Sequence, residues 1–180
     1  FDYSGGAGNP VPNYYASSPL ESAVLDSERG IYVPSVSPSK QYIRRICAMS
    51  GAASATTTTS QNQTLILLDY LLYYPFFDMD AVGEEQVTIE TQGLTRYTDG
   101  SGVQIMMVAQ APTIGGGQFT INYTNSDGVS GRVTQNQFCA AAQPSGALVN
   151  ASGAAGGVTP FVDLQDGDKG VRSIQSVTFS

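Results

Sequence analysis

Residues 118–124 (QFTINYT), followed at 125–128 by NSDG, decide the fold class of this chain. Phe119 and the apolar residues at every second position after it alternate with polar residues, which is the period of a β-strand with one buried face. The Asp-Gly pair in the following four residues is typical of tight hairpin turns. Residues 129–133 should then return as the next strand. The stretch predicts an antiparallel β-hairpin.

The same kinds of signal recur along the chain from residue 41 onward and predict about eight strands, with no long amphipathic helix. Within 86–91 (QVTIET) the alternation is strict, so Val87 and Ile89 are expected to face inward. The remaining predicted strands are 41–49, 64–74, 103–111, 161–164 and 171–179.

Residues 64–74 (TLILLDYLLYY) are the most apolar of these segments. Both faces are too apolar for an exposed strand, so the segment is expected to be the central member of the sheet. A helix is the competing prediction because leucine is a good helix former. Pro75 and the tyrosines at the end of the segment favour the strand.

Many short strands separated by Gly, Asn and Asp turns predict an all-β fold, and eight strands is the number in a jelly roll. We therefore expect a jelly-roll-like antiparallel β-sandwich over residues 41–180. An immunoglobulin-like sandwich is the alternative, but the chain has no Trp to mark its core. A length of 180 residues suits a single domain of this kind.

Residues 1–40 are expected to form an irregular, extended N-terminal arm. Segment 4–19 holds three prolines, which cannot donate a backbone hydrogen bond inside a helix or sheet. Residues 19–29 could add one or two helical turns. An arm has no core of its own, so its large apolar side chains are predicted to contact the body or a partner. They are Tyr3, Val11, Tyr14 and Tyr15.

The composition limits the possible partners. Only 13% of the residues are charged and the net charge is −7, without a basic cluster beyond Arg44-Arg45. Binding to nucleic acid or to an anionic membrane surface is therefore disfavoured. No apolar run approaches the roughly 20 residues of a membrane-spanning helix.

Enzymatic chemistry is disfavoured by the residues that the chain lacks. There is no His, and two cysteines cannot build a zinc site by themselves. No phosphate-binding loop of the G-x-x-x-x-G-K-[ST] type is present. An acidic patch at Asp78, Asp80, Glu84 and Glu85 lies in a turn-like segment, unlike the paired carboxylates of a glycosidase. We expect a non-enzymatic protein without a cofactor.

Two weaker site hypotheses remain from the sequence. Asp163, Asp166 and Asp168 group oxygen ligands near a glycine, as Ca²⁺ prefers, but Asp-Gly is also a common turn dipeptide, and the turn is favoured. Cys47 and Cys139 could form a disulfide, but two buried thiols are the favoured alternative.

Four segments together resemble structural proteins of tailed bacteriophages, of the capsid decoration or cement type. They are 68–77 (LDYLLYYPFF), 94–110 (LTRYTDGSGVQIMMVAQ), 119–132 (FTINYTNSDGVSGR) and 167–179 (GDKGVRSIQSVTF). The resemblance implies a homo-oligomeric β-sandwich, with a trimer favoured, on the exterior of the virion capsid. It implies the major capsid protein as partner and transfers no individual site residues.

Two other functions stay open. One is a tail, neck or fibre component of the virion. The other is a secreted carbohydrate-binding β-sandwich, in which Tyr97 and Tyr123 would stack on the sugar ring in place of the missing Trp.

Overall fold

The computed structural model describes residues 20–24, 36–42, 44–45, 68–109, 113, 115–139, 141 and 161–180. Within these residues the fold is all-β: there are five strands and no helix. Among them there is accordingly no helix with the length and apolar character needed to cross a membrane. The strands are β1 (Glu85–Val87), β2 (Gly117–Asn125), β3 (Arg132–Val133), β4 (Gln137–Cys139) and β5 (Val171–Phe179).

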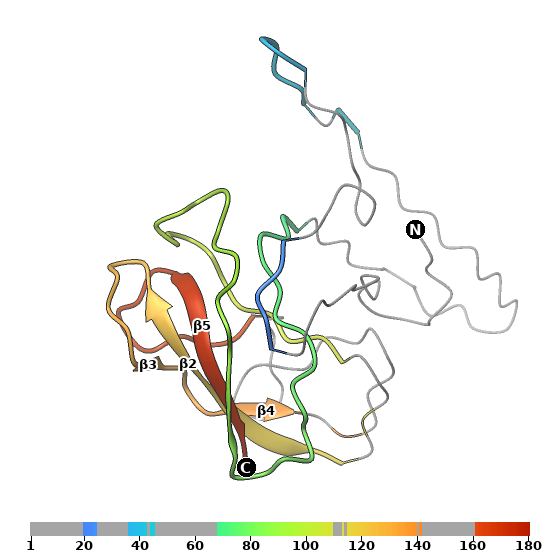
Figure 1. Cartoon of the computed structure of the whole chain (residues 1–180), viewed down its shortest axis with the longest axis vertical. Helices are drawn as coiled ribbons and strands as arrows, with labels where there is room; N and C mark the ends of the chain where they lie inside the picture. The colour runs from blue at the N-terminus through green and yellow to red at the C-terminus, as the bar shows by residue number, and fades with distance from the viewer. Residues whose placement is uncertain are drawn as a thin grey trace, which may run out of the picture.

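All five strands belong to one antiparallel sheet, shown in Figure 1. The path across the sheet is β1-β5-β2-β3, and β4 pairs with the beginning of β2. The two nine-residue strands, β2 and β5, therefore form the centre. Their register shifts between Asn122 and Tyr123 and again between Thr124 and Asn125, as at a β-bulge.

One face of the sheet carries the core. Phe119, Ile121 and Tyr123 on β2 are at most 1% exposed, and Phe119 lies against Phe179 of β5 with ring centroids 5.9 Å apart. Partly buried side chains from outside the sheet pack on this cluster. They are Phe77, Met79, Met107 and Leu164, together with Ile174 of β5.

The predicted hairpin is confirmed, although its second strand is short. Strand β2 contains residues 118–124 with the expected face buried, and β3 spans only Arg132–Val133. In the turn, Gly128 donates to the carbonyl of Asn125 at a φ of 80°, a conformation that glycine adopts without strain. The prediction of a strand over 171–179 is also confirmed, as β5.

The expectation for residues 64–74 is wrong where the structure describes them. Residues 68–74 form neither a central strand nor a helix, and Tyr73 makes a single bridge with Ala23. The segment runs beside the core face instead, where the hydroxyl of Tyr74 accepts a hydrogen bond from the amide of Ile174. A segment that covers a sheet and a strand inside the sheet both carry apolar side chains, so the composition could not separate the two.

The orientation predicted for 86–91 is also wrong. Val87 is 59% exposed and Ile89 is 54% exposed. The inward positions belong to polar side chains that make local hydrogen bonds. Gln86 exchanges two with the backbone of Asp78, and Thr88 donates to the carbonyl of Ile174.

The described part of the predicted arm is attached to the body. Residues 20–24 lie between two segments, with Glu21 bridged to Ile89 in parallel and Ala23 bridged to Tyr73 in antiparallel orientation. The one or two helical turns expected over 19–29 are absent from residues 20–24, where Glu21 and Ala23 make β-bridges instead. The rest of the arm is described only at 36–40, where every residue is exposed.

Two other predicted strands are replaced by isolated backbone hydrogen bonds, among them that from the amide of Val171 to the carbonyl of Val103. Within 103–109 and 161–164 no strand forms, but the carbonyl of Ile105 accepts the amide of Val162. Of the strand predicted over 41–49, the described residues 41–42 and 44–45 are exposed and not in a strand. Strand β4 was not predicted.

Candidate functional site

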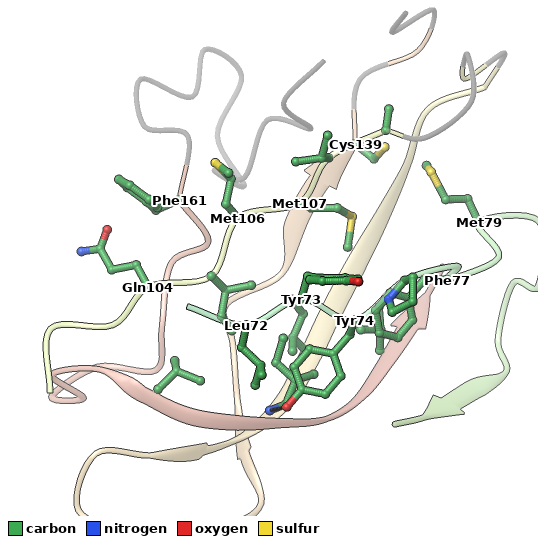
Figure 2. A pocket seen from close by; sticks show the side chains of 18 of the residues that line it. Leu72, Tyr73, Tyr74, Phe77, Met79, Gln104, Met106, Met107, Cys139 and Phe161 are labelled. Carbon is green, nitrogen blue, oxygen red and sulfur yellow. Dashed lines mark hydrogen bonds between the residues drawn. The ribbon is translucent and has the colours of Figure 1, made fainter. Parts of the chain in front are cut away.

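A cavity of about 1090 Å³ lies over the core face of the sheet. It is bounded by residues 68–80, by 101–109 and by side chains of β2 and β5. Figure 2 shows Phe161 and Gln104 at one end, Phe77 and Met79 at the other, and Tyr73, Tyr74, Met106 and Met107 between them. Methionine side chains adapt their shape readily, so this lining suits apolar groups of varied outline.

The polar groups of this lining include the charged side chains of Asp69, Asp78, Asp80 and Arg172. Among the labelled side chains of Figure 2 they are the Tyr hydroxyls, the Gln104 amide and the Cys139 thiol. Burial, together with the negative charge of Glu90, raises the pKa of Tyr74 to about 12, although the hydrogen bond from Ile174 acts to lower it. Burial also raises the pKa of the Cys139 thiol. Both groups are therefore neutral at ordinary pH.

A second feature is a polar cluster at the end of the β2–β3 hairpin, centred on the carboxylate of Asp168. It accepts hydrogen bonds from Tyr123 Oη at 2.5 Å, Asn125 Nδ2 at 2.7 Å and Arg132 Nε at 2.9 Å. The side chain of Asp168 is 4% exposed. The cluster ties the loop before β5 to the hairpin, and the amide of Gln165 adds a hydrogen bond to Tyr123 Oη.

The hydrogen bonds and burial in this cluster set the protonation states of its side chains. Burial alone would raise the pKa of Asp168, but the hydrogen bonds from Arg132, Tyr123 and Asn125 outweigh it and lower the pKa to about 2. Burial and the adjacent carboxylate raise the pKa of Tyr123 to about 12. The cluster is thus an anion, a cation and a neutral phenol across the whole ordinary pH range, and no member of it is poised to exchange a proton.

The structure does not gather the carboxylates of Asp163, Asp166 and Asp168 into one cluster. Asp163 and Asp166 are exposed, whereas the carboxylate of Asp168 is occupied by its three donors. No group of three acidic, His or Cys side chains able to hold a metal occurs among the described residues. In the other patch, the Asp78 carboxylate accepts the amide of Asp80, a turn interaction.

The structure separates the two tyrosines considered for sugar stacking. Tyr97 is 59% exposed, with a φ of 51°. Tyr123 is fully buried, and its hydroxyl is used by Asp168 and Gln165, so its ring cannot stack on a ligand.

Several predicted contact residues lie outside the described part of the chain. These are Tyr3, Val11, Tyr14 and Tyr15 of the arm, and Cys47 of the cysteine pair. Cys139 is described and is buried at the end of β4.

The sequence analysis missed Arg132 and Asn125 as partners of Asp168. A signal was present, because Arg132 lies opposite Tyr123 once the hairpin is paired. Asp168 itself comes from a distant loop, and nothing in the local pattern placed that loop at the hairpin.

Exposed apolar side chains occur on the strands away from the core face. Val87 of β1 is opposite Ser176 of β5, Ser176 is opposite Asn122 of β2, and Asn122 is opposite Val133 of β3. Both valines therefore belong to the outer face of the sheet. Val133 and Phe138 are each 45% exposed. Between these apolar edges the outer face carries small polar side chains, and the buried Oδ1 of Asn122 has no hydrogen-bond partner.

Comparisons of the chain with protein-family models, with curated proteins and with solved structures find no match. Functional inference therefore begins from the residues and surfaces above.

Proposed function

We propose that this protein is a non-enzymatic structural component of a tailed-phage virion, most specifically a head decoration protein that binds the outer surface of the capsid. The observation that supports it best is the sheet itself. Large apolar side chains are exposed at its edges, on β1, β3 and β4, while the carboxylate of Asp168 beside it is paired with Arg132. Such a surface suits protein–protein contact better than acid–base chemistry.

The finer architecture is part of the proposal. The described sheet would be one layer of a jelly-roll-like sandwich, with its core face closed by a second layer. The resemblance of 68–77, 94–110, 119–132 and 167–179 to decoration proteins supports this architecture and the homo-oligomer, preferably a trimer, that such proteins form. Decoration stabilises a capsid by mass action, because a ligand that binds only the assembled lattice lowers the free energy of that state at every copy.

The proposal assigns capsid binding to the arm and to one end of the sheet. Deleting residues 1–19 should leave the domain folded and reduce occupancy on purified heads of the phage that encodes the protein. A matched variant, Asp166→Asn in an exposed loop, should bind normally. Unchanged occupancy after the deletion would contradict the role of the arm.

Two alternatives have distinguishable outcomes. A tail, neck or fibre component would be located away from the head by electron microscopy of labelled particles. A secreted sugar-binding protein would bind members of a glycan array and lose that binding in Tyr97→Ala. The buried Tyr123 no longer supports this alternative.

A further inference from the structure

The sheet has an open edge at β1. In an antiparallel pair, successive residues direct their backbone groups to opposite sides. The amide of Thr88 bonds Gln175 of β5, so the backbone groups of Glu85 and Val87 point away from the sheet. Within the described residues nothing pairs with these outward groups.

The structure already shows that this edge accepts an added segment. Two residues after Val87, the outward amide of Ile89 donates to the carbonyl of Leu20, and the carbonyl of Ile89 accepts the amide of Ser22. Leu20 is the first described residue of that segment and has a φ of 63°. The pairing therefore covers the edge at Ile89 and leaves it open at Glu85 and Val87.

The open edge is both apolar and acidic. Val82, Val87 and Ile89 are 63%, 59% and 54% exposed. The side chains of Glu84, Glu85 and Glu90 are also exposed, and the segment carries no basic residue between positions 78 and 90. Soluble proteins normally block an exposed apolar edge of this kind, because it invites another strand to pair with it.

A complementary segment exists in the same chain. The described residues of 36–45 are all exposed, and Tyr42 is 82% exposed. Lys40, Arg44 and Arg45 belong to this segment, three of only 8 basic residues in the protein. No described residue makes an ion pair with any of the three. Figure 1 shows the segment, in cyan, projecting away from the sheet.

The spacing of the charges also matches. Lys40 and Arg45 are five positions apart, as Glu85 and Glu90 are. A parallel register that sets Lys40 opposite Glu85 also sets Tyr42 opposite Val87. The edge at Ile89 is already paired with Leu20 and Ser22, so backbone pairing ends before it and Arg45 reaches Glu90 only with its long side chain. Tyr42 would then lie over the exposed valine between the acidic positions, as aromatic and β-branched pairs do across strands.

We propose that residues 40–45 of one copy add as a strand to the β1 edge of a second copy. The contact would consist of backbone hydrogen bonds to Glu85 and Val87, apolar packing on Val87, and ion pairs between the basic segment and the acidic edge. The basic segment and the β1 edge are different surfaces of each copy, so the contact is head-to-tail and repeated contacts can close into a ring. This self-association does not depend on the proposed binding to capsids, and it is measured without them.

The test uses the full chain in sedimentation equilibrium at several protein and salt concentrations. We expect a concentration-dependent oligomer whose dissociation constant rises by about tenfold or more in high salt, because exposed charges are screened. Lys40→Glu with Arg45→Glu, and separately Glu85→Lys with Glu90→Lys, should each abolish association. Mixing the two charge-reversed chains should restore it. Lys169→Glu with Asp127→Lys, two exposed charges elsewhere, should have no effect.

Two further measurements guard against variants that misfold. Val87→Pro removes only an outward amide, which a proline on an edge strand tolerates, so it should dissociate the oligomer and retain the native near-ultraviolet spectrum. In the unaltered chain, carbodiimide should link Lys40 to Glu84, Glu85 or Glu90 between light and heavy isotope-labelled copies. A monomer at every concentration, or an oligomer indifferent to both charge reversals and lacking these links, overturns the proposal.

Discussion

Tyr123 and Asp168, 45 residues apart in the chain, are joined by a 2.5 Å hydrogen bond from the tyrosine hydroxyl to Oδ2 of the carboxylate. The same oxygen accepts Nε of Arg132. Asn125, whose amide nitrogen bonds the other carboxylate oxygen, uses its own Oδ1 to accept the amide of Val129 in the hairpin turn. A single carboxylate therefore fixes the hairpin turn, β3 and the loop before β5 in one arrangement.

Removing the charge of this carboxylate should destabilise the fold. Asp168→Asn is expected to lower the free energy of unfolding by about 2 kcal/mol, because buried donors lose a charged acceptor. Urea denaturation measures the change. Asp163→Asn, at an exposed position in the same loop, is the control and should be nearly neutral. Equal effects of the two substitutions would contradict the assigned role.

Low pH should test how much the same carboxylate contributes to stability. The folded protein lowers the pKa of Asp168 from 3.8 to about 2, so its contribution to stability is complete above pH 3.8. That contribution is lost as the pH falls through about 2, because the carboxylate of Asp168 is then protonated in the folded state as well. Melting temperatures measured across this window should decline more steeply for the natural chain than for Asp168→Asn. Parallel declines would show that the ion pair with Arg132 contributes nothing.

Alkaline conditions should test Tyr123. Its pKa is raised from 10.0 to about 12 in the folded protein, so stability is full below pH 10 and falls as the pH rises towards 12. Tyr123→Phe removes this dependence and, by losing two hydrogen bonds, should cost about 1 kcal/mol at neutral pH. Tyr97→Phe, on an exposed ring, should preserve both the neutral stability and the alkaline decline. Spectrophotometric titration of the phenols gives an independent measurement.

The sequence predicted those parts of the fold that rest on local alternation. The segment 118–124 has one apolar face, so its strand, its buried side and the following turn were all recoverable from neighbours in the chain. Strand β5 was recoverable for the same reason. These two strands form the centre of the sheet, which explains why the all-β class could be predicted before any pairing was known.

The failures have a common physical cause. Whether Val87 faces the core depends on what lies across the sheet, and the alternation of 86–91 gives only the period. Whether 68–74 is inside the sheet or beside it depends on β2 and β5 pairing directly with each other. The candidate site behaves likewise: Tyr123 was singled out for a ligand, but a distant aspartate determines what its hydroxyl does.

The close approach of two backbones at Gly100 and Gly170 should be intolerant of side chains. A Cβ on Gly100 would lie 2.5 Å from the carbonyl oxygen of Val171, and the φ of Gly100 is 79°. Gly102 is the matched control, because its φ is 74° but a Cβ there would meet nothing within 4 Å. Gly102→Ala should cost about 1 kcal/mol from backbone strain alone. Gly100→Ala should cost about 2 kcal/mol more, through displacement of the first residue of β5. Thermal unfolding of the two variants measures the difference, and equal costs would contradict the close approach.

Ser22 should hold the described part of the arm on the body. It is 1% exposed, and its hydroxyl donates to the carbonyl of Gln92 and accepts the amide of the same residue. Its carbonyl accepts the hydroxyl of Thr91 as well. Ser22→Ala removes two part-buried hydrogen bonds to the backbone of Gln92, at a cost of about 1 kcal/mol. Among the described residues, the backbone-to-backbone hydrogen bonds of this segment join it to Tyr73, Pro75 and Ile89, which lie outside the five strands, so the loss should open the segment locally and leave the core intact.

Hydrogen exchange followed by mass spectrometry distinguishes local opening from global unfolding. In Ser22→Ala the amides of Ala23 and Tyr73, which bond each other's carbonyls, should exchange faster, while those of β2 and β5 keep their protection. Ser101→Ala, at an exposed serine, should change neither set. Uniformly faster exchange would mean that the segment is part of the cooperative core. Unchanged exchange at Ala23 would mean that backbone pairing alone holds it, because the two bridges would then suffice without the serine hydroxyl.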